Sequence, residues 1–250
     1  MATNYRWLAR YYDHLFEYDV PFRRARRRIL DPLLPKVRSA CDLACGTGTQ
    51  ALALASRGIQ TFAIDLSPTM CQLAREKART PRAKPKFRVI RADMRDFSLP
   101  QSVDLVTCEY DALNHVPDKA DLHHVLARVA SALEPGGYFA FDVNNRLSFE
   151  RIWSHTWFIE KDPVAVTMHG DHEPGSDRAW IELEWFVREG KLWKRHHERV
   201  EEVCWSEKEM REALAAAGFD RLRRWDAAPF FNDMLTRPGN RTFWLARKAA

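Results

Sequence analysis

Short apolar runs alternate with amphipathic segments through most of the first 143 residues. Apolar residues recur at helical spacing within residues 1–35, and from Ser39 onward the pattern changes to brief runs of strand length. These runs are residues 40–44, 60–65, 87–91, 103–108 and 138–143. Repeated strand–helix–strand units of this length predict an α/β fold with a mostly parallel sheet and right-handed crossovers.

Capping residues mark where the intervening helices begin and end. Ser67 before Pro68 predicts a helix start, because the serine hydroxyl accepts from free amides and proline needs no amide partner in the first turn. Asp118, with Asp121 three residues later, opens another helix in the same way. We expect the Pro-Gly-Gly turn at residues 135–137 to end that helix before the fifth strand.

A period-two pattern replaces the alternation after the fifth strand. Residues 163–169, 178–188 and 192–203 alternate apolar with polar positions, and Glu189-Gly190-Lys191 suits a hairpin turn. We expect an antiparallel unit at residues 147–205, inserted before the last α/β repeat.

The last repeat follows this insertion. Ser206 and Glu209 form a capping box ahead of a helix, and residues 219–225 and 241–247 supply two closing strands. The whole chain, residues 1–250, is therefore expected to form a single domain.

Two helices precede the first strand, within residues 1–35. The first has an apolar stripe made of Trp7, Leu8, Tyr11, Tyr12, Leu15 and Phe16. The second carries a run of arginines between its apolar positions, namely Arg23, Arg24, Arg26, Arg27 and Arg28. Such a run is typical of the solvated face of an amphipathic helix, and a nucleic-acid-binding surface is the alternative.

Composition places the chain among ordinary globular proteins. It has 250 residues, 46% of them hydrophobic, and 39 Lys and Arg against 34 Asp and Glu give a net charge of +5. No apolar stretch has the length of a membrane span, and the first residues lack the apolar core of a signal peptide. Five cysteines without a C-x-x-C motif favour reduced thiols, so we expect a cytoplasmic protein that does not bind a membrane.

The tryptophans are unevenly distributed. The chain has nine, and five of them fall within the expected insertion, at Trp153, Trp157, Trp180, Trp185 and Trp193. They would line an acceptor pocket, form the face of a homodimer, or pack the core of the insertion.

The first strand runs into a glycine turn that opens a helix. Gly46-x-Gly48-x-x-Ala51, with Asp65 at the end of the second strand, satisfies a loose dinucleotide-binding pattern. The backbone at such a turn can approach a ligand closely, and an acid at the position of Asp65 can accept from ribose hydroxyls. Asp42, inside the first strand, suits a ligand with an ammonium group better than one with a pyrophosphate.

Four motifs in order resemble class I S-adenosylmethionine (SAM)-dependent methyltransferases. They are the segment from Asp42 to Gly48, Asp65, residues 92–97 (ADMRDF) after the third strand, and residues 108–115 (CEYDALNH) after the fourth. The resemblance implies a doubly wound, seven-stranded Rossmann-like sheet in the order 3-2-1-4-5-7-6. Residues 1–35 would then be a helical lid, and residues 147–205 a substrate cover.

The resemblance also implies which residues bind SAM and its product S-adenosyl-L-homocysteine. Asp65 would bind the ribose, Asp93 the adenine amine and Met94 the adenine ring, and Tyr12 would lie over the cofactor. The implied cofactor-binding set is Tyr12, Asp42, Ala44, Cys45, Gly46, Gly48, Asp65, Leu66, Asp93, Met94 and Cys108. For several of them a purely structural role is the alternative, such as a turn carboxylate for Asp93 or a core thioether for Met94.

Methyl transfer is an in-line displacement, so the enzyme must align a nucleophile and exclude water, with a base only where the acceptor is protonated. His115 is the candidate base or acceptor-orienting residue, and Tyr110 is its catalytic neighbour in the same segment. A surface or helix-start histidine is the alternative for His115. His169, Asp171 and His172 lack an evident further ligand, so no metal is expected.

A small molecule is the expected methyl acceptor, at a nitrogen or an oxygen. Amino methyltransferases that act on nucleic-acid bases carry an Asn/Asp-Pro-Pro-aromatic motif after the fourth strand. This chain has residues 109–112 (EYDA) there instead, which argues against a nucleic-acid acceptor. The inserted unit resembles the cover of glycine/sarcosine and deoxyamino-sugar N-methyltransferases. Two alternatives stay open: an RNA methyltransferase guided by the arginines of residues 23–28, and a SAM-binding protein without catalysis.

Overall fold

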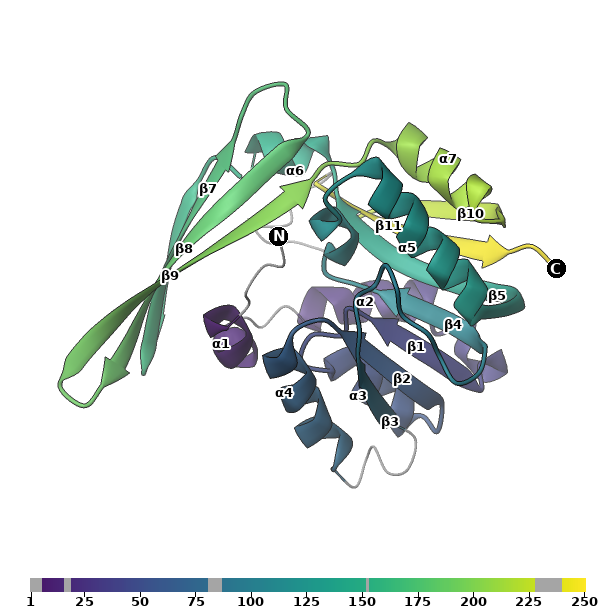
Figure 1. Cartoon of the computed structure of the whole chain (residues 1–250), viewed down its shortest axis with the longest axis horizontal. Coiled ribbons are helices and arrows are strands. Elements are labelled where there is room, and N and C mark those ends of the chain that lie inside the picture. The colour runs from purple at the N-terminus through teal and green to yellow at the C-terminus, as the bar shows by residue number, and fades with distance from the viewer. Residues whose placement is uncertain (1–5, 16–18, 81–86, 152, 228–239) are drawn as a thin grey trace.

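Two β-sheets organise the molecule. The computed structural model describes residues 6–15, 19–80, 87–151, 153–227 and 240–250. A seven-stranded sheet lies between layers of helices, and a smaller four-stranded sheet projects from one end of it (Figure 1).

The large sheet has the predicted strand order. Its strands are β1 (Ser39–Leu43), β2 (Gln60–Asp65), β3 (Phe87–Arg91), β4 (Val103–Cys108), β5 (Leu133–Asn144), β10 (Phe219–Asp226) and β11 (Arg241–Lys248). They follow the order β10-β11-β5-β4-β1-β2-β3, in which only β11 runs antiparallel to its neighbours. This confirms the Rossmann-like order 3-2-1-4-5-7-6, with β10 and β11 as the sixth and seventh strands.

Helices bury both faces of this sheet. The helices of the described residues are α1 (Trp7–Leu15), α2 (Asp19–Ile29), α3 (Thr49–Ser56), α4 (Pro68–Ala78), α5 (Lys119–Ala132), α6 (Arg146–Arg151) and α7 (Glu207–Ala216), with short 3₁₀ turns η1 (Leu34–Lys36) and η2 (Ala112–His115). Helices α5 and α7 pack with the sheet in one apolar cluster, and α2 and α3 pack in another. No helix among the described residues is long and apolar enough to cross a bilayer.

The predicted helix caps form. Ser67 Oγ accepts from the Met70 amide at 3.3 Å, and an Asp118 carboxylate oxygen accepts from the Asp121 amide at 2.8 Å. Ser206 and Glu209 make the reciprocal capping box of α7. Phe16, expected in the stripe of the first helix, lies outside the described residues.

The Pro-Gly-Gly turn differs from the prediction. Instead of separating α5 from a strand at Tyr138, residues 135–137 lie inside β5, which begins at Leu133. The ladder between β4 and β5 shifts register between Val103 and Leu105 to accommodate them. A Cβ atom on Gly137 would lie 2.9 Å from the Glu134 carbonyl oxygen, so the close backbone approach at this irregularity requires glycine.

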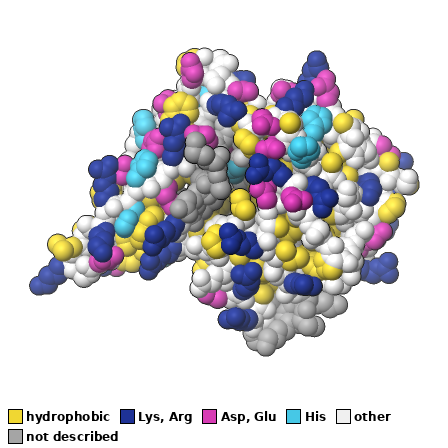
Figure 2. All heavy atoms as spheres, in the orientation of Figure 1, with side chains coloured by type: hydrophobic (Ala, Val, Ile, Leu, Met, Phe, Trp, Pro, Cys, Tyr) yellow, Lys and Arg dark blue, Asp and Glu magenta, His cyan; other side chains and the backbone are white. Residues whose placement is uncertain are grey.

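The insertion forms an antiparallel sheet of four strands. They are β6 (Thr156–Lys161), β7 (Val164–His172), β8 (Arg178–Glu189) and β9 (Leu192–Val203), paired in that order. The sequence pattern predicted the last three and missed β6, an edge strand whose side chains are mostly exposed. Charged and histidine side chains are spread along the exposed face of this sheet (Figure 2).

The other face of the insertion packs against α1. Trp185 is fully buried beside Tyr11, with ring centroids 6.3 Å apart, and Trp7 stacks on His196 at 3.8 Å. Glu198, on β9, accepts hydrogen bonds from the amides of Arg6, Trp7 and Leu8 at 2.7, 2.7 and 3.0 Å. Because these amides are the free donors at the start of α1, the helix is bound to the insertion.

Helix α2 belongs to the core of the large sheet. Its apolar side packs on β11, where Phe22 contacts Phe243 edge to face at 5.6 Å. Arg23, Arg24, Arg27 and Arg28 are exposed. Arg26 departs from the expected solvated face, because it turns inward and pairs with Glu109 through Nε at 2.9 Å.

The carboxylate of Glu198 should hold α1 in place. We expect Glu198→Ala to speed hydrogen exchange of the α1 amides about tenfold, the equivalent of losing roughly 1.4 kcal/mol from a helix cap. Hydrogen-exchange mass spectrometry measures this directly. Glu201→Ala is the matched control, since its exposed side chain lies on the opposite face of the same strand. Equal exchange in both variants would show that Glu198 does not anchor α1.

Candidate active site

The predicted site segments meet at one edge of the large sheet. Strands β1, β2 and β4 are parallel, so the segments that follow them lie at their common carboxyl end. Strand order reverses between β1 and β4, the position at which open α/β sheets bind ligands. The insertion and α1 lie beside this edge (Figure 1).

The turn after β1 has a left-handed backbone at three residues. Ala44, Gly46 and Gly48 have φ values of 52°, 53° and 81°. A Cβ on Gly48 would lie 3.0 Å from both Ala74 and Phe87, so packing requires this glycine. The nearest atom to a Cβ on Gly46 would be Met70 Sδ at 3.9 Å. Gly46 therefore leaves room at the surface of the turn for a ligand.

Asp65 fixes the glycine turn from the end of β2. Its carboxylate accepts from the Gly46 amide at 2.9 Å and from the Ser67 amide at 2.8 Å. Burial raises the pKa of Asp65, and these backbone hydrogen bonds oppose that rise. A carboxylate accepts at about four positions, so Asp65 still has room for hydroxyl donors.

Asp42 is buried beneath the turn. Its Oδ1 accepts from Thr107 Oγ1 on β4 at 2.7 Å, and Oδ2 has no hydrogen-bond partner among the described residues. Burial, followed by the charge of Glu109, raises the pKa of Asp42 to about 7. The carboxyl group is thus poised between its neutral and charged forms near neutral pH.

The segment after β3 places Asp93 and Met94 near the same edge. Asp93 is engaged by Arg95, whose Nη2 lies 2.7 Å from Oδ2 and whose amide lies 2.9 Å from Oδ1. Hydrogen bonds from Arg95 lower the pKa of Asp93. Met94 packs against the main core, while Leu66 is 44% exposed and presents an apolar surface next to Asp65.

The cysteines of the predicted set differ in exposure. Cys108 is fully buried and Cys45 is half-buried, and burial raises the pKa of both thiols. Both are free thiols. At neutral pH they are protonated, so only their backbone and their volume can serve a ligand.

Helix α1 reaches the glycine turn through Asp13. One Asp13 oxygen accepts from Thr47 Oγ1 at 2.7 Å, and the other pairs with Lys77 Nζ at 2.7 Å. Lys77 also donates to Thr47 and Thr49. Tyr12 precedes Asp13 and is half-buried, so α1 lies beside the glycine turn, and its role as a lid stays a prediction.

The loop after β4 is held by a buried carboxylate that the sequence did not single out. Tyr110 and Asp111 have left-handed φ values of 60° and 55°, which are unfavourable for residues other than glycine. Asp142 on β5 accepts from the Tyr110 amide at 2.8 Å and from the Asp111 amide at 3.0 Å. These two hydrogen bonds stabilise the turn that positions η2.

Arg241 on β11 completes this cluster. It pairs with Asp142 and, at 3.0 Å, with Asp111. Asn144 donates to Asp111 at 2.8 Å and to Glu202 of the insertion at 2.9 Å. The buried polar groups of β5, β9, β11 and the β4 loop are therefore hydrogen-bonded to one another.

Burial and charge set different proton affinities within the cluster. Burial raises the pKa of Asp142 to about 6, even though Arg241 opposes the rise. Burial and the charge of Asp111 raise the pKa of Glu202 far above its ordinary value. Burial also acts to raise the pKa of Asp111, but Arg241 and the hydrogen bond from Glu202 outweigh it and lower that pKa.

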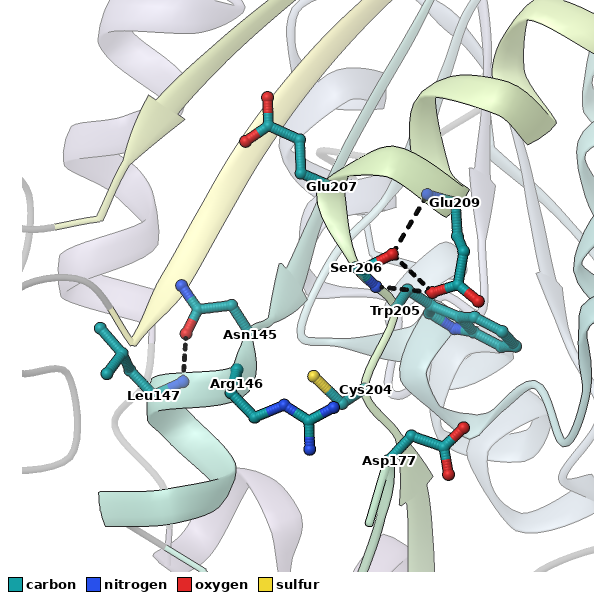
Figure 3. A pocket seen from close by; sticks show the side chains of 9 residues that line it. All are labelled: Asn145, Arg146, Leu147, Asp177, Cys204, Trp205, Ser206, Glu207 and Glu209. Carbon is teal, nitrogen blue, oxygen red and sulfur yellow. Dashed lines mark hydrogen bonds between the residues drawn. The ribbon is translucent and has the colours of Figure 1, made fainter. Parts of the chain in front are cut away.

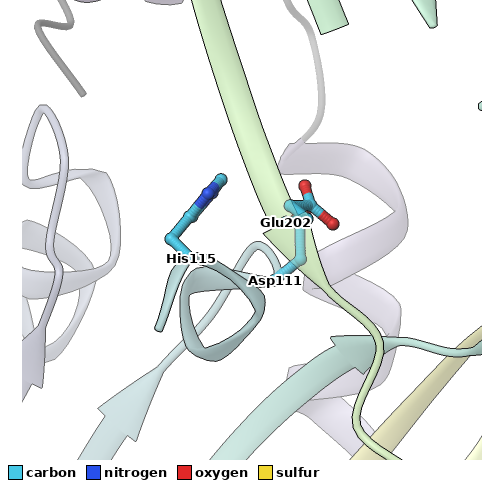
Figure 4. Close-up of side chains that lie close together, drawn as sticks. All are labelled: Asp111, His115 and Glu202. Carbon is cyan, nitrogen blue, oxygen red and sulfur yellow. The ribbon is translucent and has the colours of Figure 1, made fainter. Parts of the chain in front are cut away.

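His115 lies at the edge of this cluster. One carboxylate oxygen of Asp111, one of Glu202 and one ring nitrogen of His115 all lie within 4.8 Å of one another (Figure 4). The Nδ1 atom of His115 contacts the Glu201 carbonyl oxygen at 3.1 Å. Tyr110 does not share this environment, since its ring stacks on Phe22 of α2 at 3.9 Å.

The other histidines considered for a metal lie on the insertion. His169 contacts Thr156 Oγ1 at 2.8 Å, and His172 Nε2 contacts the Ser176 carbonyl oxygen at 3.1 Å. Both residues, with Asp171, belong to β7. The cluster at Asp111 already contains a cationic group, the guanidinium of Arg241.

A cavity of about 530 Å³ lies beside the cluster, between the starts of α6 and α7 (Figure 3). Arg146, Asp177, Cys204 and Glu209 are among its lining residues. The Glu209 carboxylate is committed to the capping box of α7, and Arg146 donates to the Ser176 carbonyl. None of the predicted site residues lines this cavity.

The tryptophans of the insertion have several roles. Trp153 and Trp185 are core residues, at 4% and 0% exposure. Trp193, near the hairpin tip, is 45% exposed. Core packing therefore accounts for two of the five tryptophans of the insertion. A homodimer formed through this region stays a prediction.

The raised pKa of Asp42 predicts a pH-dependent stability. Between pH 4 and 7 the unfolded chain loses this proton while the folded protein retains it, so Asp42 lowers the free energy of unfolding as pH rises. Asp42→Asn removes this effect. Urea unfolding at each pH gives the free energy of unfolding of both proteins. From pH 4 to pH 8 we expect this free energy to change in favour of Asp42→Asn over the native chain by on the order of 3 kcal/mol. A pH-independent difference would contradict the raised pKa.

Comparison with known proteins agrees with this architecture. Residues 40–137 match the model of a methyltransferase domain family. A SAM-dependent methyltransferase from Clostridium acetobutylicum ATCC 824 is 26% identical, covers 98% of this chain and 99% of its own, and superposes with a TM-score of 0.81.

Two further relatives extend the likeness beyond that domain. The dTDP-3-amino-3,6-dideoxy-alpha-D-glucopyranose N,N-dimethyltransferase of Streptomyces fradiae is 28% identical over 74% of this chain and 71% of its own. DesVI of Streptomyces venezuelae shares the fold, with a TM-score of 0.75 over 97% of both chains at 21% identity. With the strand order and the motifs at the sheet edge, these matches show that the chain is an enzyme of the SAM-dependent methyltransferase family.

Proposed function

We propose that this enzyme transfers a methyl group from SAM to an amine nitrogen of a small molecule. The observation that carries the proposal is the position of His115. It lies after β4 at the ligand-binding edge of the sheet, beside a buried carboxylate cluster and in contact with the inserted sheet. This combination suits an acceptor that arrives as an ammonium ion and must lose a proton before it reacts.

The residues around the glycine turn fit the cofactor. Gly46 leaves open space, Asp65 has acceptor positions for ribose hydroxyls, and half-exposed Leu66 offers an apolar surface to the adenine. Asp42 lies below the turn, and its Oδ2 has no hydrogen-bond partner among the described residues, so a cation bound nearby would favour the charged form of this carboxyl group.

The remaining predicted residues would complete this site. Met94 would pack on the adenine, and Asp93 would bind its amine with an acceptor position that Arg95 leaves open. Ala44, Cys45, Gly48 and Cys108 would contribute backbone and shape. Tyr12 would cover the cofactor from α1, which Asp13 holds against the turn.

SAM, when bound, supplies an electrophilic methyl group on a sulfonium centre. His115 takes the proton of the acceptor ammonium, whose N–H electron pair becomes the lone pair of the amine. The amine lone pair would then form the bond to the methyl carbon, and the electron pair of the broken carbon–sulfur bond would stay on the sulfur of the cofactor. Tyr110, stacked on Phe22, keeps the loop of His115 in place.

Two features support an amine over other acceptors. The Streptomyces fradiae relative is named for N,N-dimethylation of an amino sugar. It aligns over 74% of this chain, so the alignment extends beyond the matched domain at residues 40–137. Above about pH 6 the ionised carboxylates of Asp111 and Asp142 in the cluster beside His115 outnumber the single guanidinium of Arg241. Excess negative charge attracts a cationic acceptor.

We also propose that the enzyme works in the cytoplasm. All five cysteines are free, and four of them are buried. Reduced thiols are typical of a reducing compartment.

The cofactor site is tested by isothermal titration calorimetry with S-adenosyl-L-homocysteine. We expect Asp65→Ala and Asp93→Ala each to raise Kd by roughly 10-fold or more, the worth of a lost hydrogen bond to a charged group. Asp96→Ala, a nearby exposed carboxylate, is the matched control and should bind normally. Native affinity in both site variants would refute the proposed cofactor site.

The acceptor is tested with methyl-labelled SAM and a small panel of acceptors. We expect methylation of dTDP-3-amino-3,6-dideoxyglucose or a simpler amino sugar, and none of the matched sugar with a hydroxyl in place of the amine. His115→Asn should lower kcat by about 100-fold or more, as expected for the loss of a general base, with cofactor affinity unchanged. His124→Asn, exposed on α5, is the control.

Each other outcome points elsewhere. Methylation of RNA but of no amine would favour a role for the exposed arginines of α2. Full activity of His115→Asn on an amine would remove His115 as the base. Cofactor binding without transfer to any acceptor class would favour a non-catalytic SAM-binding protein.

A further inference from the structure

His115 has one ring nitrogen committed to the inserted sheet. Its Nδ1 lies 3.1 Å from the Glu201 carbonyl oxygen of β9. A carbonyl oxygen can only accept, so Nδ1 must carry the hydrogen in this contact. In the neutral ring Nε2 is then the nitrogen with the lone pair. The backbone of the insertion thus selects the tautomer that can accept a proton at Nε2.

Charged groups from four elements form the cluster beside His115, and Asp111 and Glu202 are its members nearest to the ring. Asp111 precedes its 3₁₀ turn, Asp142 comes from β5, Glu202 from β9 and Arg241 from β11. Glu109, in the same loop as Asp111, is already paired with Arg26 of α2.

The protonation of this cluster leaves one net negative charge. Glu202 is 4% exposed, and its burial together with the nearby carboxylate keeps it neutral, since its pKa is raised far above the ordinary value. Above about pH 6, Asp111 and Asp142 are ionised against the single guanidinium of Arg241. An uncompensated negative charge of this kind stabilises a cation formed beside it.

We propose that Asp111 and Glu202 are positioning residues for His115: the Asp111 carboxylate stabilises the imidazolium that forms when His115 takes a proton, and the Glu202 carboxyl holds Asp111 in place from the inserted sheet. The proposal rests on the proposed role of His115 as base. It gives the insertion a part in proton transfer as well as in covering the site.

The geometry supports this division of roles. Asn144 Nδ2 donates both to Asp111 at 2.8 Å and to Glu202 at 2.9 Å, so the two carboxyl groups share one donor. A neutral Glu202 can also donate its own proton to Asp111, which leaves the charge on Asp111. Asp111 is anchored on its other side by Arg241 at 3.0 Å.

The test is an NMR measurement that needs no acceptor. Histidine ring nitrogens of the full ¹⁵N-labelled chain are observed by long-range ¹H–¹⁵N correlation, and the His115 signals are identified by their loss in His115→Asn. We expect the Nδ1–H tautomer for His115 in the native protein. The Nε2–H tautomer would overturn the proposal, and this reading requires no variant in the cluster to fold.

Variants then separate the two positioning residues. Asp111→Asn keeps a residue type that tolerates the left-handed backbone, and it should move the midpoint of the His115 titration to lower pH because a negative charge beside the imidazolium is lost. Glu202→Gln preserves a neutral hydrogen-bonding side chain and should leave the midpoint unchanged. Glu201→Gln is the matched control, because it alters an exposed carboxylate and keeps the carbonyl that binds Nδ1.

The contrary results are distinct. An unmoved midpoint in folded Asp111→Asn would make Asp111 merely structural, and a shift as large in Glu202→Gln as in Asp111→Asn would mean that Glu202 carries the charge. Either result overturns the proposal while leaving methyl transfer untouched, since no acceptor takes part. Failure of the acceptor panel would instead count against the proposed function. Calorimetry with S-adenosyl-L-homocysteine confirms that each variant keeps its cofactor site.

Discussion

The buried pairing of Arg241 with Asp142 and Asp111 is the interaction on which the site depends. Asp142 holds two backbone amides of the loop after β4 in a left-handed conformation, and Arg241 compensates the charge that this requires. Because an uncompensated carboxylate is costly to bury, the antiparallel last strand is needed to stabilise the turn that presents His115. The sheet order and the candidate base are thus connected by one ion cluster.

The insertion is connected to both halves of the site. Glu198 binds the start of α1, and Asp13 near the end of that helix binds the glycine turn. Glu202 and the carbonyl of Glu201, from the same strand, reach the loop after β4. The glycine turn, through α1, and the loop after β4 are therefore bridged by the same inserted strand, β9.

Several site features follow from local sequence, because they depend on neighbouring residues. The glycine turn, the acid at the end of β2 and the caps of α4, α5 and α7 each require particular residue types at short spacing. Arg26 shows the limit of such patterns. In the sequence it is one arginine of a basic helix, yet the fold turns it toward Glu109, 83 residues away.

The α/β architecture and the position of the methyltransferase motifs follow from the amino-acid pattern alone, since hydrophobic period and turn chemistry are local properties. Which charged side chains contact one another depends on the folded arrangement of the strands. Asp142, Glu202 and Arg241 are ordinary strand residues in the sequence, and they become one buried cluster beside His115 because β5, β9 and β11 converge at the same edge. Long-range pairing and burial set their protonation, and neither can be read from residue spacing.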